Sequence, residues 1–413
     1  MTPFYYGWVI AGVAGSANFS RVSSAVEISS IFLPALVLTY GWSATVIASA
    51  TTIGSIGSAL AGPFIGRLLD RYGSRVVVPL GAFIVGLGCF ALALTQSPFL
   101  FVGFYAIVRM AGQSMVMFPN SVTIAQWFER KRGTATAVMS AISATGLIIA
   151  PVVAQSIISG AGVGAAWAAL GALALLMGVV PGLLLLARRP EDIGLSPDGD
   201  ATPSPALREE AATAHHAAFG ADYTLALALR TPALWAIVAV SFLVSGVMTG
   251  VSFHQLNYYT AQGIHPGTGS AIVAVYATGI AAGGVLWGWL ADRIHVRYLL
   301  LAIYVIAAVL VTLLMGVTSP IQAFPIAFTF GTLVGGAMSI PTLLVADYYG
   351  RLSLGSISGV VYMARALGLG TGPLVAAAFY DLTQSYQQAF LLFVSVCVAS
   401  AVLMVIMRRP ARL

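Results

Sequence analysis

Apolar and polar stretches alternate along this chain in a regular way. Each apolar stretch is about 20 to 30 residues long and is followed by a connection, usually short. A helix needs about 20 apolar residues to cross the hydrocarbon core of a bilayer. The pattern therefore predicts an all-α membrane protein with twelve transmembrane helices. We expect the crossings at about residues 6–36, 44–66, 76–96, 98–126, 134–158, 165–187, 231–260, 268–290, 298–318, 321–346, 354–380 and 388–407.

The Lys and Arg residues of the connections fall on one side of the predicted membrane. They follow the even-numbered crossings, whereas the odd-numbered crossings are followed by connections without any cation. Cytoplasmic loops carry the excess of cations in membrane proteins. We therefore expect both termini and the long central connection to be cytoplasmic. The cations concerned are Arg67, Arg71, Arg75, Arg130, Lys131, Arg132, Arg188, Arg189, Arg208, Arg230, Arg293, Arg297, Arg351, Arg408, Arg409 and Arg412.

The composition excludes an ordinary soluble enzyme. Hydrophobic residues make up 59% of the chain and charged residues only 8%, against about a quarter charged in soluble domains. The net charge is +6, and most of the cations lie in these loops, so we expect the lipid bilayer and not nucleic acid as a partner. Cys89 and Cys397 lie in separate apolar stretches, and no paired metal-ligand or nucleophile motif occurs. We therefore expect no disulfide, no metal, no cofactor and no enzymatic activity.

The chain repeats itself across a polar linker. Shifting the sequence by 222 positions aligns glycine, proline, aspartate and arginine residues without a gap from the second to the fifth crossing. The pattern predicts a six-helix bundle at 1–188, a cytoplasmic linker at 189–230 and a related six-helix bundle at 231–413. Repeats of this kind are typical of transporters that expose a site near the midplane to either side in turn. The aligned pairs include Gly66 and Gly288, Asp70 and Asp292, Arg71 and Arg293, Arg75 and Arg297, and Gly133 and Gly355.

The two homologous loops carry one motif. The segment GRLLDRYGSR at 66–75 resembles the loop signature of the major facilitator superfamily, and GWLADRIHVR at 288–297 repeats it with His295 in place of a glycine. Gly66 and Gly288 would let neighbouring helices approach, while Asp70 and Asp292 can accept hydrogen bonds from helix N-termini and arginines. The resemblance implies a conformational role for these loops, including Arg71, Arg75 and Arg293.

Further segments resemble one branch of that superfamily, the bacterial monocarboxylate and oxalate:formate transporters. They are FYYGWVIAGV at the start, WF with RKRG at 127–133, LRTPALW at 229–235 and GLGTGP at 368–373. The resemblance implies a monomeric symporter or exchanger in the bacterial inner membrane, with a small organic anion as substrate and the proton as coupling ion. A positive charge facing the transport pathway is then the feature to seek.

Charged residues deep in the crossings are costly, so each one is a functional candidate. Arg365 lies in the middle of the apolar segment VVYMARALGLGTGP, and its counterpart in the repeat is Ser143. We interpret Arg365 as the substrate anchor, with a structural pairing or an interfacial position as alternatives. Arg109 begins RMAG, which resembles an element of the fourth helix of the superfamily. For Arg109 a structural or coupling role is favoured over substrate contact.

Glu27 is the carboxylate of the first crossing, and burial would raise its pKa as a proton carrier requires. Its alternative role is in an ion pair. Arg21 lies six residues away, about 120° around the helix, so a partner on another helix is favoured for Glu27, and Arg21 is a further candidate for anion binding.

Polar residues near two helix ends complete the candidates. His254 matches a histidine of the monocarboxylate branch. It either binds substrate, titrates, or is a gate residue whose polar groups have partners within the protein. Asn257 and Tyr258 lie on the following turn. Asn120 follows Pro119 at a helix break, either as a polar contact or as part of a simple kink.

Two departures keep a second function open. The eighth-helix arginine of the monocarboxylate branch falls on Gly284 here, and the first-helix lysine of mammalian members falls on Val26, beside Glu27. The alternative is proton-driven efflux of an amphipathic or cationic compound, with Glu27 as its acceptor. Drug-efflux antiporters usually have a glycine before the proline of the fifth helix, where this chain has Ala150. A receptor that kept the fold is disfavoured because the linker is too polar to be a signalling domain.

Overall fold

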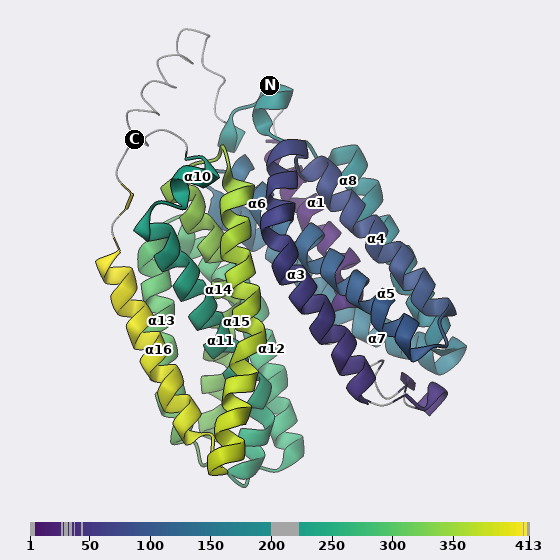
Figure 1. Ribbon diagram of the computed structural model, residues 1–413, viewed down its shortest axis with the longest axis vertical. Helices are drawn as coiled ribbons and strands as arrows, with labels where there is room; N and C mark the ends of the chain where they lie inside the picture. Colours follow the sequence, from purple (N-terminus) through teal and green to yellow (C-terminus); the bar gives the residue numbers. More distant parts are fainter. Residues whose placement is uncertain are drawn as a thin grey trace. The chain divides into compact units, whose positions relative to one another are not determined.

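The computed structural model describes residues 5–25, 28, 32, 35–36, 38–42, 44–199, 223–407 and 409–410 (Figure 1). Every regular element in these residues is helical. The longer elements are α1 (Gly7–Ser20), α3 (Ala44–Tyr72), α4 (Ser74–Leu94), α5 (Pro98–Ala111), α6 (Phe118–Trp127), α7 (Arg132–Ala174), α11 (Pro232–Ala261), α12 (Pro266–Ala291), α13 (Val296–Met315), α14 (Pro320–Tyr349), α15 (Leu354–Thr383) and α16 (Gln387–Ile406). The shorter ones are η1 (Val22–Ser24), η2 (Gly112–Met117), η3 (Leu175–Val179), α8 (Val180–Leu185), η4 (Pro190–Ile193), η5 (Pro197–Gly199) and α10 (Leu225–Ala228).

The described helices agree with twelve crossings. Nine helical segments among the described residues are long and apolar enough to span a membrane. One of them, Arg132–Leu185, contains two helices, because Gly162 has a φ of 88° that interrupts the helical path. Helices α1 and α3 lie at the first two predicted crossings. The chain is therefore an all-α, multi-pass membrane protein, as the hydropathy pattern predicts.

The chain divides into two compact units. Unit 1 comprises Met1–Glu129, Val138–Phe219 and Arg351–Gly359, and unit 2 comprises Arg130–Ala137, Gly220–Gly350 and Val360–Leu413. The start of α7 thus groups with unit 2, and the start of α15 groups with unit 1. The predicted division at a linker over 189–230 stays a prediction, since residues 200–222 lie outside the described part of the chain.

In unit 1, the fourth crossing is one continuous path built from three elements. Helix α5 passes into the π-helical turn η2 and then into α6, which has Pro119 in its first turn. Proline lacks an N–H and its ring clashes with the carbonyl four residues earlier. A wider π turn before it accommodates both effects, and such turns are frequent at functional sites. The turn places Gly112 beside the end of α1, where an added Cβ would lie 2.7 Å from Ser24 Oγ.

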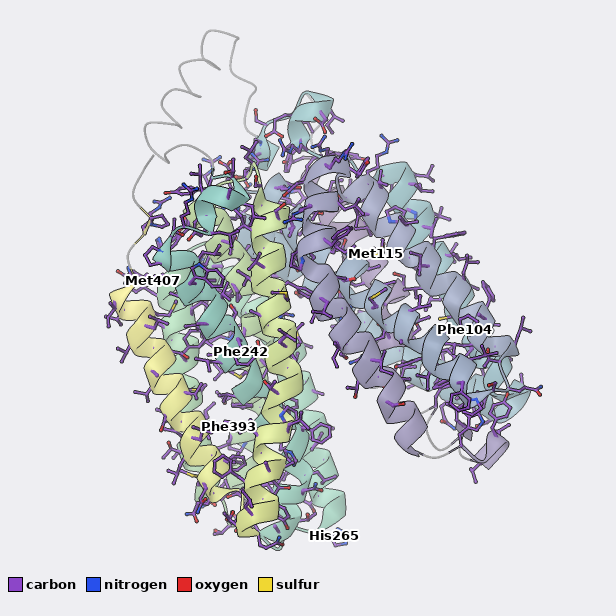
Figure 2. The ribbon with its side chains drawn as sticks, viewed as in Figure 1. Phe104, Met115, Phe242, His265, Phe393 and Met407 are labelled. Carbon is purple, nitrogen blue, oxygen red and sulfur yellow. The ribbon has the colours of Figure 1, made fainter. Side chains whose placement is uncertain are left out.

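In unit 2, glycines bring two pairs of helices into backbone contact. Helices α12 and α14 meet so closely that a Cβ on Gly335 would lie 2.7 Å from the backbone nitrogen of Gly284. The glycine found where the monocarboxylate branch has an arginine is therefore part of this helix contact. Helices α11 and α15 also touch through glycines. The ring of Phe393 projects from α16 (Figure 2). A Cβ added to Gly250 of α11 would lie 2.5 Å from Cζ of Phe393.

Candidate functional site

The two motif aspartates bind helix starts in the same way. In unit 1, the carboxylate of Asp70 accepts hydrogen bonds from the backbone N–H groups of Gly355 (2.8 Å) and Ser356 (2.7 Å). In unit 2, the carboxylate of Asp292 accepts from the N–H groups of Gly133 (2.5 Å) and Thr134 (2.6 Å), and from the Thr134 hydroxyl. An anion at a helix N-terminus satisfies free N–H groups and the helix dipole.

These contacts are related by the sequence repeat, because Gly355 and Ser356 are the counterparts of Gly133 and Thr134 at the offset of 222. The glycines allow the approach. A Cβ on Gly355 would lie 2.6 Å from the carbonyl oxygen of Gly66 and 2.7 Å from Asp70 Oδ1, and a Cβ on Gly288 would lie 2.7 Å from the carbonyl oxygen of Gly133.

The motif arginines are placed differently from the aspartates. Arg71, Arg75 and Arg293 are exposed, and Arg293 stacks over the ring of Trp289 at 3.7 Å. Helix α3 continues to Tyr72 and so carries most of the motif as helix, beyond the crossing predicted at 44–66. It ends there because Gly73, with a φ of 75°, turns the chain into α4.

Arg109 is held inside unit 1 by two polar groups. Its side chain is 7% exposed and donates from Nε to Ser55 Oγ (2.8 Å) and from Nη1 to the carbonyl oxygen of Ser24 (2.5 Å). The arginine thus joins α5 to α3 and to η1, the turn that follows α1. This arrangement supports the structural or coupling role over direct substrate contact.

Replacing Arg109 with leucine is expected to destabilise the protein by about 1 to 3 kcal/mol, because the buried Ser24 carbonyl would lose this charged donor. The melting temperature of the detergent-solubilised variant measures this effect. Arg230→Leu is the matched control, because Arg230 is exposed beside α10. Equal melting temperatures for the two variants would show that the Arg109 hydrogen bonds contribute little.

Asn120 takes part in a buried polar chain across three helices of unit 1. Its Nδ2 donates to the Ala14 carbonyl (3.0 Å) and to Asn18 Oδ1 (3.1 Å), and Asn18 Nδ2 donates to Ser143 Oγ (2.8 Å). Asn120 therefore ties α6 to α1, and through Asn18 to α7, more than it marks a simple kink.

Arg21 follows α1 directly and is partly exposed, whereas Glu27 lies outside the described residues.

His254 is buried in unit 2 between α11, α15 and the start of α16. Its Nε2 lies 3.0 Å from the Pro373 carbonyl and its Nδ1 lies 3.2 Å from the Tyr386 hydroxyl. A carbonyl oxygen only accepts, so Nε2 is the donor to Pro373. In the neutral form of the ring, Nδ1 then accepts from the Tyr386 hydroxyl. Tyr258 donates to the Leu314 carbonyl at 2.8 Å, and Asn257 is exposed on another face of α11. This geometry favours the interpretation of His254 as a gate residue whose ring nitrogens both have partners within the protein.

Arg365 lies in α15 and is partly exposed. Its Nη1 donates to the carbonyl oxygen of Met338 on α14 at 2.5 Å. Met338 is 37% exposed. It directly follows Ala337, the residue whose carbonyl loses its helical partner because Pro341 has no N–H. The guanidinium is therefore anchored by a neutral group at an accessible position.

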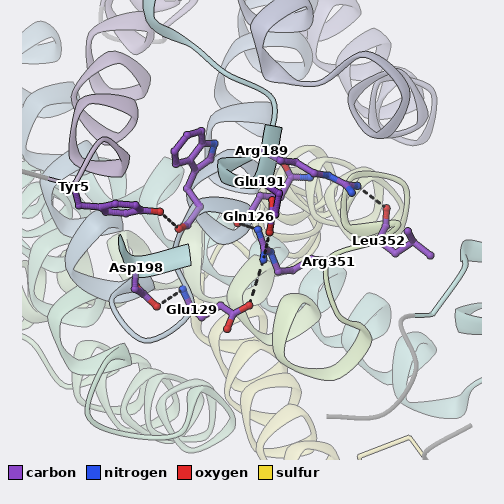
Figure 3. A network of polar contacts seen from close by, with 9 residues as sticks. Tyr5, Gln126, Glu129, Arg189, Glu191, Asp198, Arg351 and Leu352 are labelled. Carbon is purple, nitrogen blue, oxygen red and sulfur yellow. Dashed lines mark hydrogen bonds and ion pairs between the residues drawn. The ribbon is translucent and has the colours of Figure 1, made fainter. Parts of the chain in front are cut away.

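A charged network that the sequence reasoning missed lies at the loop ends of unit 1. Arg351 Nη1 pairs with Glu191 (3.0 Å) and with Glu129 (3.4 Å), and its Nη2 donates to the carbonyl of Gln126. Asp198 accepts from the Glu129 N–H at 3.0 Å, so η5 is tied to the residues that follow α6 (Figure 3). The four acidic residues of the segment PEDIGLSPDGD were the available signal.

Among the described residues, no group of three or more His, Cys, Asp and Glu side chains could hold a metal ion. The polar groups instead hold helices together, cap helix starts or, at Arg365, face an accessible position. Such an arrangement can bind a small charged molecule and change conformation.

Comparison with known proteins relates this chain to a family of membrane transporters. A sequence profile described as Major Facilitator Superfamily matches residues 13–264 and 255–413. The chain is 23% identical over 332 residues to the MFS transporter asaE of Aspergillus flavus, covering 79% of this chain and 69% of that one. It is 26% identical over 171 residues to monocarboxylate transporter 12 of Rattus norvegicus, covering 40% and 35%.

A solved structure has the same fold. The chain is similar to the proton:xylose symporter XylE with a TM-score of 0.74 and 15% identity, covering 97% of this chain and 95% of that one. These relatives are transporters and not enzymes. The family profile matches most of the sequence, and the fold with twelve crossings agrees with it. This chain therefore belongs to the Major Facilitator Superfamily of membrane transporters.

Proposed function

We propose that this protein is a secondary active transporter of small organic anions of the monocarboxylate class, coupled to protons and working by alternating access. The observation that carries this proposal is Arg365, a partly exposed guanidinium in the apolar helix α15 that is held by a backbone carbonyl. An ionised group at such depth is costly and is retained where it serves transport. A guanidinium presents paired donors that match the geometry of a carboxylate.

The other arginines of the described crossings fit this role less well. Arg109 is buried and committed to Ser24 and Ser55, so a substrate reaches it only by breaking those bonds. Arg21 is partly exposed at the end of α1 and remains a second candidate for the anion. We assign substrate binding to Arg365 first because it occupies the middle of its helix.

The relatives support the substrate class and the coupling by analogy. The partial match to monocarboxylate transporter 12 favours a monocarboxylate, and the shared fold with a proton:xylose symporter agrees with proton coupling. Glu27 stays the predicted proton carrier. We further propose a monomer in a bacterial inner membrane with cytoplasmic termini, in keeping with the distribution of cations in the loops.

A thermal-shift panel on purified, detergent-solubilised protein tests the proposal. Pyruvate, lactate, oxalate, benzoate and a set of organic cations are compared at two pH values, because a ligand that binds the native state raises its melting temperature. We expect stabilisation by one class of carboxylates, stronger at the lower pH. Stabilisation by organic cations alone would contradict the proposal and favour proton-driven efflux with Glu27 as the acceptor.

A further inference from the structure

We infer that Ser339 and Trp287 complete the anion site of Arg365, each donating a hydrogen bond to the carboxylate of the substrate. This inference rests on the function proposed above and adds two neutral donors that determine specificity for a carboxylate. All three side chains belong to unit 2, on α14, α12 and α15.

Trp287 brings an unsatisfied donor to α14. Its side chain is 6% exposed, and its indole Nε1 is buried with no hydrogen-bond partner within the described chain. A Cβ added to Gly336 would lie 2.6 Å from Trp287 Cδ1, the carbon bonded to Nε1. The glycine at 336 therefore lets the N–H edge of the indole lie directly against α14.

Ser339 brings a second unsatisfied donor to the same helix. It is 7% exposed, and its Oγ is buried without a hydrogen-bond partner in the described residues. Ser339 follows Gly336 by three positions, and residues three apart on a helix are neighbours about 5 to 6 Å apart on one face. It also follows Met338, whose carbonyl accepts from Arg365 at 2.5 Å. On α14, Ser339 thus adjoins Met338, which binds the guanidinium, and lies one turn from Gly336, which contacts the indole.

The chemistry of this group selects an anion. A guanidinium, a hydroxyl and an indole N–H all donate, and a carboxylate offers two oxygens that accept from several donors. A buried donor without a partner costs about 1 to 3 kcal/mol in the folded protein, and a carboxylate bound at Arg365 would relieve that cost at both positions. A cationic ligand would be repelled by the positive charge of Arg365 and could not accept the hydrogen bonds of Ser339 and Trp287.

Two conservative variants test the inference. Ser339→Ala and Trp287→Phe each remove one donor and keep most of the side-chain volume. The matched controls are Ser400→Ala and Trp167→Phe, since Ser400 Oγ and Trp167 Nε1 are also buried and unpartnered among the described residues. Apparent affinities for pyruvate, lactate, oxalate and benzoate are measured by thermal-shift titration of the full-length protein.

We expect Ser339→Ala and Trp287→Phe each to weaken binding of the stabilising carboxylate about tenfold, with both controls equal to wild type. Because the donors are unsatisfied without ligand, we also expect the unliganded melting temperature not to fall. Wild-type protein that no carboxylate stabilises would overturn the proposed function and this inference together. Wild-type binding with unchanged affinity in both variants, or a loss explained by a lower unliganded melting temperature, would overturn this inference alone.

Discussion

Replacing Arg365 with alanine is expected to lower the affinity for the substrate anion by at least about thirtyfold while the folded protein persists. Truncating one partner of a hydrogen-bonded charge pair costs about 2 kcal/mol or more. Arg365 is partly exposed and is held to the Met338 carbonyl, so its truncation opens no buried core position. Thermal-shift titration with the stabilising carboxylate measures the affinity, and expression yield with unliganded melting temperature reports the fold.

Arg365→Lys is the informative companion variant. It keeps the positive charge and removes the planar, paired donors of the guanidinium, so we expect an affinity between those of wild type and Arg365→Ala. Unchanged affinity in Arg365→Ala would end the assignment of Arg365 as anchor. Arg21→Ala would then be the next variant to measure.

Removal of the motif carboxylates is expected to loosen the starts of α15 and α7. Asp70→Asn and Asp292→Asn replace two carboxylate oxygens with one amide oxygen and remove the negative charge at a helix N-terminus. Each change weakens charge-assisted bonds to two backbone N–H groups, at about 1 to 2 kcal/mol per site. Amide hydrogen exchange is expected to become about tenfold faster at Gly355 and Ser356 in the first variant, and at Gly133 and Thr134 in the second.

The same variants are expected to transport more slowly in proteoliposomes, because both contacts sit in the motif that the repeat preserves. Asp192→Asn serves as the control, since Asp192 is exposed and removing it changes the net charge by the same amount. Exchange rates at the two helix starts that match those of the control would contradict the capping role of these aspartates.

Most of the fold was predictable because each crossing carries its own signal. In a bilayer a helix satisfies its backbone hydrogen bonds internally, so a run of apolar residues is enough to indicate it. The predicted crossing at 76–96 is α4 at Ser74–Leu94, and that at 354–380 is α15 at Leu354–Thr383. The π turn at Gly112–Met117 was not predicted, because it depends on how Pro119 and the neighbouring α1 constrain the same stretch.

The candidate site was predictable only in part. Arg109 is buried against groups at the end of α1, and its structural or coupling role stays a prediction. The partners Ser55 and Asn18 were not identified, since a serine or asparagine in an apolar run gives no sign of which helix it faces. The hydroxyl of Ser339 and the indole of Trp287 were missed for the same reason.

The sequence by itself determined the membrane environment, the helical class, the twelve crossings and the doubled motif, because hydropathy and the repeat are local properties of the chain. Only the tertiary structure decided which polar groups meet. It paired Asp70 with the start of α15, His254 with Pro373 and Tyr386, and Arg365 with Met338. These contacts join residues 27 to 286 positions apart, and helix packing depends on side-chain shape and close glycine contacts rather than on hydropathy.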